Sequence, residues 1–389
     1  MPSSRHLDRL ALADYALPAS ITERLFSPAL VVFLDHVRAN VQQVVEYMGG
    51  EPTRWRPHVK TTKTPVIWRE LVNAGVRHFK CATPREAEYL VKLLLEMAVE
   101  GADVLVAYPL LPPNIDKIER LAKAHPGLRL SVLSEAPTHA ASVSAELGVF
   151  VDINPQMNRT GIPMADRAGI EAVARAAGSR FRGLHFYDGH VRDNLAPARQ
   201  ERCWELYREL LSIEASLRKA GIVVGELITS GTPAFPYALS FAGFQELDNT
   251  VHRISPGTVV FHDMFTEDLM ADVELRPAAL LFTRVISHPT ADVATCDAGS
   301  KSLAAEAGEP AAYVLGHPGL IAQAPSEEHL PLRVVDGKLP PRGTELLLVP
   351  RHVCPTVNLA ETFLLVERDQ EASVVEVAAR AHDLLAPEA

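Results

Sequence analysis

The sequence has no long apolar run and few cysteines, and both absences exclude a class of protein. No apolar segment approaches the ~20 residues that a helix needs to cross a bilayer. The first six residues, Met-Pro-Ser-Ser-Arg-His, contain no hydrophobic core of a signal peptide. The four cysteines (Cys81, Cys203, Cys296 and Cys354) are far apart and form no CxxC pair. We therefore expect no membrane span and no disulfide framework, and we expect the reducing cytoplasm as the location.

The sequence also lacks any cluster of basic residues. The formal net charge is −10, which argues against binding to nucleic acid or to an anionic membrane surface. Hydrophobic residues make up 47% of the 389 residues and charged residues 22%, as in an ordinary globular protein. This length is sufficient for two domains.

Eight short apolar runs alternate with stretches of helical periodicity between residues 36 and 268. The runs are Trp55–Lys60, Val76–Cys81, Asp103–Tyr108, Leu128–Leu133, Val149–Asn154, Phe181–Tyr187, Glu226–Ser230 and His252–Phe261. Eight strands joined by helices are what a (β/α)8 barrel requires. The sequence therefore predicts an α/β fold, with a TIM-type barrel at 36–268.

The predicted helices carry start and stop signals. Thr83 reads as an N-cap that is followed by Pro84 at the first helical position and by Glu86, which closes a capping box. Pro65 opens the preceding helix and Gly75 closes it. An apolar stripe at helical spacing predicts a core-facing helix before the first barrel strand: Val37, Val41, Val44, Val45 and Met48.

After about Met270 the pattern changes to strands joined by Gly/Pro turns. These strands are Ala279–Ile286, Val293–Cys296, Ala312–Leu315, Leu332–Val335, Thr344–Pro350, Thr362–Glu367 and Val374–Val377. They predict an all-β domain at 269–389. The early run Ala29–Asp35 precedes the barrel, and we expect it to pair with that domain, so that segment 1–35 joins it.

Lys60 stands at the carboxyl end of the first predicted barrel strand. Residues at these ends face the active-site mouth of a barrel. A lysine that is desolvated there has a lowered pKa and becomes a nucleophile able to form an imine. Position alone leaves open the alternative of a surface lysine near a strand end.

The residues around Lys60, Pro57-His58-Val59-Lys60-Thr61-Thr62-Lys63, resemble a family motif. The motif is Pro-His-x-Lys-Thr-His-Lys of the D-threonine aldolase and D-serine dehydratase family, whose members are fold-type III enzymes related to alanine racemase. The resemblance implies an alanine racemase-like barrel, a homodimer and pyridoxal 5'-phosphate carried by Lys60. The sequence departs from the motif at Thr62, where the family usually has histidine, and Lys63 is expected to be structural or exposed.

Two Gly-Thr segments are candidates for binding the cofactor phosphate, because they follow the seventh strand and lie within the eighth segment. Barrel enzymes commonly bind phosphate in the loops after these strands. Both segments also resemble phosphate-binding segments of the family, although Pro233 stands where the family often has glycine. The candidate residues are Ser230, Gly231, Thr232, Gly257 and Thr258.

Two further residues are implied by the resemblance. The segment 152–161 is similar to an element of the family that makes Arg159 the cation beside the cofactor ring. An exposed loop arginine is the alternative. The segment 183–190 is similar to the one that supplies a cofactor-contacting tyrosine, here Tyr187. Aldolases of the family place a catalytic histidine six positions later, where this chain has Asp193.

His352 and Cys354 are candidates for a metal site. If the strand that ends near Pro350 continues, the two side chains lie two residues apart and share one face. Imidazole and thiolate together suit zinc, and a solvent-facing histidine beside a buried cysteine is the alternative. The segment His352-Val353-Cys354-Pro355-Thr356-Val357-Asn358-Leu359 resembles the zinc segment of the dehydratase members. The resemblance thus implies a divalent metal, with zinc ahead of manganese or magnesium.

The resemblance implies a lyase that acts on a small D-configured 3-hydroxy amino acid. Loss of water to give a 2-oxo acid and ammonia is the leading hypothesis, because Cys354 and Asp193 disfavour aldolase chemistry. D-Serine and 3-hydroxyaspartate are the candidate substrate types. Retro-aldol cleavage to glycine and an aldehyde is the alternative. A racemase, a non-catalytic pyridoxal-phosphate-binding protein and a metabolite-binding barrel without cofactor also remain open.

Overall fold

The structure is a computed structural model that describes residues 7–193, 195–270 and 273–386. The segment 1–6, in which the sequence shows no signal core, lies outside the described residues. The chain divides into two compact units. We call residues 44–60, 68–257 and 381–389 the barrel unit, and residues 1–43, 61–67 and 258–380 the β unit. The domain ranges 36–268 and 269–389 stay predictions.

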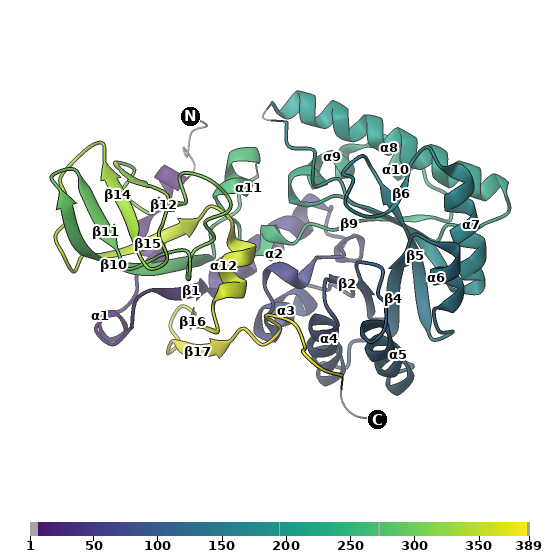
Figure 1. Cartoon of the computed structure of the whole chain (residues 1–389), viewed down its shortest axis with the longest axis horizontal. Coiled ribbons are helices and arrows are strands. Elements are labelled where there is room, and N and C mark those ends of the chain that lie inside the picture. Colours follow the sequence, from purple (N-terminus) through teal and green to yellow (C-terminus); the bar gives the residue numbers. More distant parts are fainter. Residues whose placement is uncertain (1–6, 194, 271–272, 387–389) are drawn as a thin grey trace. The chain divides into compact units, whose positions relative to one another are not determined.

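The barrel unit contains a parallel sheet of seven strands in the order in which they occur in the chain (Figure 1). They are β2 (His78–Cys81), β3 (Asp103–Val106), β4 (Arg129–Ser134), β5 (Leu147–Asn154), β7 (Phe181–Phe186), β8 (Glu226–Thr229) and β9 (Val251–Ile254). A short strand, β6 (Ile162–Pro163), pairs with β5 and was missed by the sequence patterns. The predicted alanine racemase-like barrel fold is confirmed.

The first predicted strand, Trp55–Lys60, closes this sheet but is extended only in its first part. Trp55 bridges Ile254 of β9, and His58 bridges Lys80 of β2. The chain then turns into the 3-10 helix η4 (Val59–Thr61). The expected strand His252–Phe261 also ends early, at Ile254. Pro256 has no N–H to donate to a ladder, which explains the early end.

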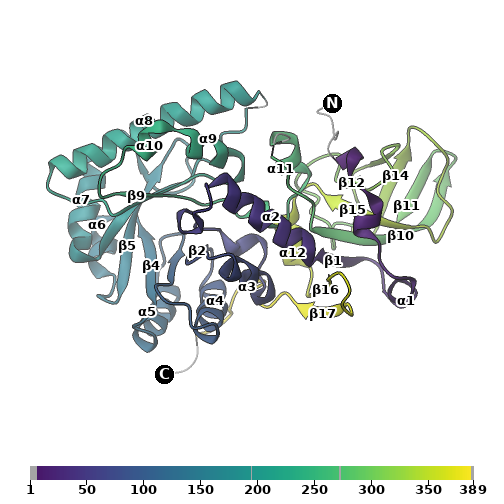
Figure 2. The same cartoon turned by 180° about the vertical axis from the view of Figure 1, so that it is seen from behind.

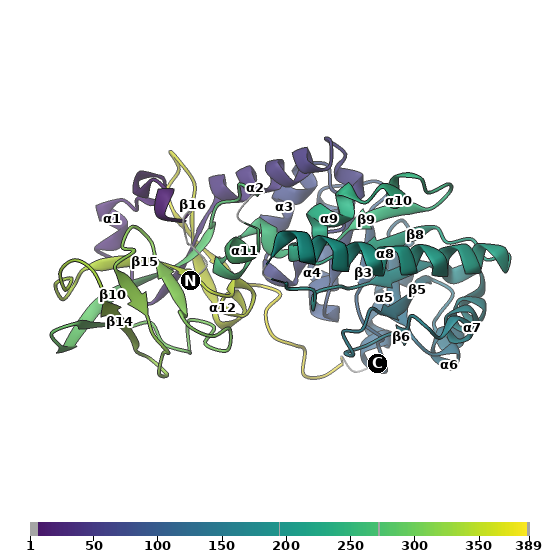
Figure 3. The same ribbon diagram turned by 90° about the horizontal axis from the view of Figure 1, so that it is seen from above.

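Helices connect the strands of the barrel unit, and Figure 3 shows α8 as a long helix running beside them. The helices from residue 65 onwards are α3 (Pro65–Asn73), α4 (Pro84–Glu96), α5 (Asn114–Ala124), α6 (Pro137–Ser142), α7 (Arg167–Ala177), α8 (Ala196–Lys219), α9 (Phe235–Ser240) and α10 (Ala242–Gln245). Pro65 opens α3, and Gly75 follows it with a φ of +93°. Both signals in the sequence are confirmed.

The predicted cap of α4 is confirmed with one difference. Thr83 Oγ1 accepts the Glu86 N–H at 3.0 Å. The Glu86 carboxylate accepts the N–H of Ala82 at 2.6 Å, one residue before the partner of a standard capping box. The apolar stripe on α2 (Leu34–Tyr47) is also confirmed, since its side chains and that of Met48 are at most 8% exposed.

Charged residues meet at the starts of the barrel strands, opposite the predicted mouth. Asp103 is the first residue of β3, and Glu226 is the first residue of β8. The Arg56 guanidinium donates to both carboxylates at 2.8 Å and is fully buried. Arg182 pairs with Asp103 at 2.8 Å and Arg253 with Glu226 at 2.7 Å. This network binds the closing segment to strands on either side of it.

The β unit contains a second sheet, in which β10 pairs with both β11 and β15 and so closes a ring of antiparallel strands. The strands are β1 (Ala29–Phe33), β10 (Ala279–Thr290), β11 (Val293–Cys296), β12 (Ala312–Val314), β13 (Leu320–Ala322), β14 (Leu330–Val334), β15 (Glu345–Pro350), β16 (Thr362–Val366) and β17 (Ser373–Glu376). The predicted all-β part is confirmed, and only β13 was not expected. The short helices of the unit are α1 (Ala19–Thr22), α11 (Met264–Leu269) and α12 (Val353–Leu359).

The N-terminal strand β1 belongs to this second sheet, as the sequence predicted. It pairs antiparallel with β10 and parallel with β16, and Figure 2 shows the three side by side. Its apolar side chains are buried in the core of the unit, where Val31 and Phe33 pack with Leu280.

Among the described residues, no helix is both long and apolar enough to span a membrane. None of the four cysteines, all of which lie in the described part of the chain, forms a disulfide, and three of them are buried.

Candidate active site

Lys60 lies in η4 and is half-buried. It comes two residues after His58, which bridges Lys80 near the carboxyl end of β2. Lys60 therefore follows a strand end of the parallel sheet, where the sequence predicted the active-site mouth. Its role as the lysine that carries the cofactor stays a prediction.

The loops after β8 and β9 are neighbours, because these two strands pair in parallel. Ser230 has a left-handed backbone with a φ of +61° and is fully buried. Within the described part of the chain, its hydroxyl oxygen has no hydrogen-bond partner. A Cβ at Gly257 would lie 2.3 Å from the carbonyl oxygen of His58, so that position requires glycine. An unpaired donor beside a tightly packed glycine loop suits a phosphate group, and the loops fit pyridoxal phosphate in this respect.

Asp188 holds the first of these loops and was missed by the sequence reasoning. One carboxylate oxygen accepts the Gly231 N–H at 2.9 Å, and the other accepts the Tyr207 hydroxyl at 2.7 Å. Burial raises the pKa of Asp188 to about 6, and the two hydrogen bonds oppose this rise. An acidic residue directly after an apolar strand was the available signal.

Tyr187 and Arg159, which the resemblance assigned separately to the cofactor, lie against each other in the structure. The guanidinium carbon of Arg159 lies 4.9 Å from the centroid of the Tyr187 ring. A Cβ at Gly189 would lie 2.4 Å from the ring, and one at Gly231 would lie 3.0 Å from it. The ring thus packs closely against backbone on two sides.

Asp193 stands at the position where aldolases of the family have a histidine. Its backbone carbonyl accepts a hydrogen bond from Arg199 at 2.7 Å.

The sequence reasoning also missed a cluster of buried polar side chains near Tyr187, whose ring centroid lies 5.6 Å from Lys80 Nζ. Lys80 Nζ lies 3.4 Å from Nε2 of His185, whose Nδ1 lies 2.7 Å from a carboxylate oxygen of Asp152. Three strands, β2, β5 and β7, supply these side chains. A lysine inside an apolar strand run was the signal that marked this group.

The expected strand geometry of His352 and Cys354 is wrong. Strand β15 ends at Pro350, and His352 is the N-cap of helix α12. The carboxylate of Asp263 accepts the N–H of Val353 at 3.0 Å. This bond satisfies a free donor of the first helical turn and favours a helix over a continued strand.

The helix nevertheless keeps the two candidate metal ligands in contact. Burial lowers the pKa of His352, but a hydrogen bond with Cys354 and the charges of Asp263 and Glu306 raise it above its ordinary value overall. Cys354 Sγ lies 3.1 Å from Thr61 Oγ1 and 3.6 Å from Thr258 Oγ1. Thr258, expected at the phosphate, therefore has its hydroxyl beside this thiol.

An imidazole and a thiol in contact fit the ligand preferences of zinc. Over the described ranges, no group of three or more His, Cys, Asp and Glu side chains is arranged to hold a metal ion. His352 and Cys354 are thus the two candidate ligands within the part of the chain that the structure describes, and the remaining coordination positions would fall to water or substrate. The metal stays a prediction.

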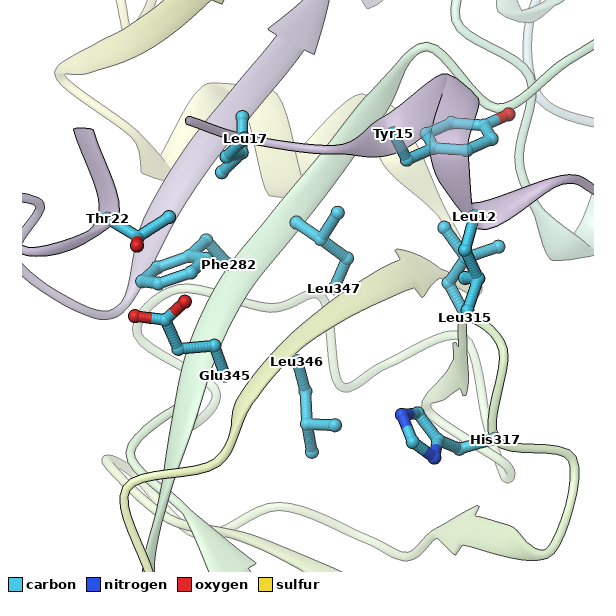
Figure 4. Close-up of a pocket in the computed structure, with 10 residues that line it drawn as sticks. All are labelled: Leu12, Tyr15, Leu17, Thr22, Phe282, Leu315, His317, Glu345, Leu346 and Leu347. Atoms are coloured by element: carbon cyan, nitrogen blue, oxygen red, sulfur yellow. The ribbon is translucent and has the colours of Figure 1, made fainter. Parts of the chain in front are cut away.

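One cavity of the β unit, near its N-terminal segment, lies apart from these residues (Figure 4). Its volume is about 200 Å³, and it is lined by Leu12, Tyr15, Leu17, Thr22, Phe282, Leu315, His317, Glu345, Leu346 and Leu347. The predicted site residues do not line it.

Two family models match the sequence. The model described as "Alanine racemase, N-terminal domain" matches residues 32–244, and the one described as "Putative serine dehydratase domain" matches residues 278–366. The resemblance inferred from the segments around Lys60 and His352 is confirmed, as is the prediction that the chain is an enzyme of this group.

Relatives cover nearly the whole chain. D-threonine aldolase from Arthrobacter sp is 28% identical over 388 residues, which are 95% of this chain and 97% of the relative. D-threo-3-hydroxyaspartate dehydratase from Delftia sp. (strain HT23) is 25% identical over 362 residues, covering 85% and 92%. The crystal structure of D-threonine aldolase from Filomicrobium marinum superposes with a TM-score of 0.79 at 26% identity, covering 92% of this chain and 96% of that one.

Proposed function

The chain belongs to the family of the alanine racemase N-terminal domain, and on this premise we propose that it is a pyridoxal-phosphate- and metal-dependent lyase of D-3-hydroxy amino acids. The observation that carries the proposal is the pair of features at the strand ends. Lys60 follows the segment that closes the barrel, and the buried hydroxyl of Ser230 has no partner among the described residues. A lysine amine and a hydrogen-bond donor for the phosphate are the two protein groups that this cofactor requires.

The cofactor and the metal would supply chemistry that side chains lack. Pyridoxal phosphate, held by Lys60 and by the loops at Ser230 and Gly257, supplies an electron sink for the pair left at Cα. A divalent ion held by His352 and Cys354 would supply Lewis acidity toward the 3-hydroxyl.

The chain's own residues bind, orient and move protons. Lys60, once its amine is free, takes the Cα proton as general base. Asp188 fixes the Gly231 N–H of the phosphate loop. Arg159 lies over Tyr187 and would provide a positive charge beside the cofactor ring.

We favour dehydration as the reaction. Lys60 removes the Cα proton, the bond between Cβ and oxygen breaks, and the hydroxyl leaves as water. Addition of water to the resulting enamine product gives a 2-oxo acid and ammonia. Cys354 and Asp193 support this choice, since the resemblance links the cysteine to dehydratases and a histidine at position 193 to aldolases.

Retro-aldol cleavage is the second candidate, and the 28% identity to the Arthrobacter D-threonine aldolase favours it. In that reaction a base removes the proton of the 3-hydroxyl, and the bond between Cα and Cβ breaks. The products are then glycine and an aldehyde.

The products distinguish the two reactions. The purified protein is incubated with pyridoxal phosphate, Zn²⁺ or Mn²⁺, and D-serine, D-threonine or D-3-hydroxyaspartate, with the L-isomers as controls. A 2-oxo acid with equimolar ammonia supports the dehydratase, whereas glycine with an aldehyde supports the aldolase. Racemised substrate with neither product set would contradict the lyase.

Variants test the assignment of the cofactor lysine. We expect Lys60→Ala to lose the visible absorbance of the bound cofactor, and borohydride reduction of the wild type to fix a pyridoxyl group at Lys60. Lys92→Ala, which removes an exposed lysine of the same unit, should keep both signals. A pyridoxyl group found on another lysine would overturn the assignment.

A further inference from the structure

Lys80 is a charged residue inside a buried strand, and the proposed reaction does not use it. Its side chain is 2% exposed, on β2 between Phe79 and Cys81. An ammonium group has three N–H donors and no acceptor. Among the residues that the structure describes, His185 is the only hydrogen-bond partner of this amine, at 3.4 Å. A buried cation with unused donors is unfavourable until an anion pairs with it.

His185 gives this amine a neutral partner and not a negative charge. Asp152 accepts a hydrogen bond from Nδ1 of the ring at 2.7 Å, so Nε2 is left as the acceptor that faces Lys80. Burial, followed by the charge of Lys80, lowers the pKa of His185, and the hydrogen bond to Asp152 opposes this, so the ring is neutral near pH 7. The carboxylate of Asp152 is one imidazole ring away from the amine. The histidine therefore orients Lys80 without supplying a counter-charge at its ammonium group.

A second cation lies at the same aromatic ring as Lys80. Lys80 Nζ is 5.6 Å from the centroid of the Tyr187 ring, and the guanidinium carbon of Arg159 is 4.9 Å from it. Burial lowers the pKa of Lys80 to about 7, the charge of Lys60 acts next in the same direction, and Asp188 opposes both. The positive charges around the Tyr187 ring therefore attract an anion.

The order of the strands indicates which anion this is. The closing segment, residues 55–60, carries Lys60 and bridges β9 on one side and β2, the strand of Lys80, on the other. The candidate phosphate loops follow β8 and β9, on the first side. In pyridoxal phosphate, the ring carbon that bears the aldehyde has the phosphate arm on one neighbouring carbon and the ring hydroxyl on the other. An aldehyde held by Lys60, with the phosphate on the β9 side, directs the ring hydroxyl toward β2 and Lys80.

We propose that Lys80 is a cofactor-binding residue, whose ammonium group donates a hydrogen bond to the ring oxygen of pyridoxal phosphate and keeps that oxygen ionised. The identity of the cofactor rests on the proposed function, whereas the burial and the unused donors of the amine are properties of the chain itself. A hydrogen bond between two charged groups is roughly twice as strong as one between neutral groups, and it is stronger still away from water. His185 accepts one N–H of the ammonium and so leaves the others for the ring oxygen.

Pyridoxine phosphate tests this contact without the reaction, because it lacks the aldehyde that Lys60 would capture. Its ultraviolet absorbance shows whether the ring hydroxyl is ionised. We expect the ionised form when the compound is bound to the wild-type protein at pH 7, and the neutral form when it is bound to Lys80→Met. Lys92→Ala, which removes an exposed lysine of the same unit, should give the wild-type spectrum.

The methyl ether of the ring hydroxyl of pyridoxine phosphate is the matched control ligand, since its ring oxygen cannot ionise. Equilibrium dialysis gives the affinity of each protein for both compounds. Lys80→Met should weaken binding of pyridoxine phosphate at least about tenfold and change binding of the ether less than about twofold. An equal loss for the two ligands would place Lys80 against another part of the cofactor and overturn the proposal.

Lys80→Gln is the second variant, because its amide keeps a hydrogen-bonding group beside His185 if Lys80→Met does not fold. It should also bind pyridoxine phosphate with a neutral ring hydroxyl. An ionised hydroxyl in a folded Lys80 variant, or a neutral one in the wild type, overturns the proposal. If product assays fail while the binding results hold, the lyase function is lost and the role of Lys80 stands. If the wild type binds neither compound, both are overturned.

Discussion

At the scale of single residues, Ser230 joins a left-handed backbone to a buried hydroxyl with no partner in the described part of the chain. A buried donor without a partner is unfavourable in the protein alone and becomes useful when an anion accepts its hydrogen bond. Ser230→Ala should therefore lower pyridoxal-phosphate affinity roughly 10- to 100-fold while leaving the stability of the free protein unchanged or higher.

Titration of the apoprotein with cofactor and thermal unfolding without it measure the two effects of Ser230→Ala. Ser216→Ala removes an exposed serine on α8 and should change neither. Equal affinity in wild type and Ser230→Ala, with a lower unfolding temperature in the variant, would contradict the phosphate role.

Asp188 links protonation to stability. Its pKa is about 6 in the folded protein, above the ordinary 3.8, so the folded state binds a proton that the unfolded state releases. Stability from this group therefore rises as pH falls from about 7 to about 4. Relative to Asp188→Asn, the free energy of unfolding of the wild type should increase over that range. Urea unfolding at several pH values measures it, and parallel curves for the two proteins would refute it.

Residue type and local motif indicated Lys60, Ser230, Tyr187 and the His352/Cys354 pair as candidates, because each lies in a short contiguous segment that resembles a known one. The contacts that join Lys80, His185 and Asp152, and the hydrogen bonds of Asp188, were not predicted. Their meaning comes from strands that are distant in sequence and adjacent in the sheet, and a single sequence does not state that pairing.

At the scale of elements, residues 55–60, which close the barrel sheet, pair with their neighbouring strands through isolated bridges and not through a continuous ladder. Their attachment to the sheet therefore depends on side chains. Arg56 joins them to β3 and β8 through two buried carboxylates. Arg56→Met should lower the free energy of unfolding by about 3 kcal/mol, because it leaves two buried carboxylates without one partner. The loss should not be larger, since Arg182 still pairs with Asp103 and Arg253 still pairs with Glu226.

Arg129→Met provides the matched control for Arg56. Arg129 lies 3.6 Å from the same Asp103 but is 57% exposed, so its loss should cost less than about 1 kcal/mol. Chemical unfolding gives both values. Equal losses of stability in Arg56→Met and Arg129→Met would show that burial does not determine how much each ion pair contributes.

Helix α12 shows why local pattern misjudged one element. The apolar run of β15 indicated a strand that continues through His352, whereas Asp263 binds the N–H of Val353 from a distant part of the chain and starts a helix. The two candidate ligands still meet, because helical geometry at the N-cap and second helical position also brings them into contact.

At the scale of the whole molecule, the rhythm of strands and helices was sufficient to predict both folds. Seven parallel strands follow chain order, so that each pairs with a strand close to it in sequence. Periodicity detects such units well. The closing bridges and the strand β13 escaped prediction because they are short and give little periodic signal.

The position of β1 between β10 and β16 has a consequence for biosynthesis. Val31 pairs with Leu280 and with Leu364, which are separated from it by most of the chain. A ribosome adds about 5–20 residues per second, so β1 is made early and waits while every barrel strand is completed. The parallel strands find neighbours as they emerge. β1 finds its second partner only when residues 362–366 have been made, so the first strand to be synthesised is among the last to enter its sheet.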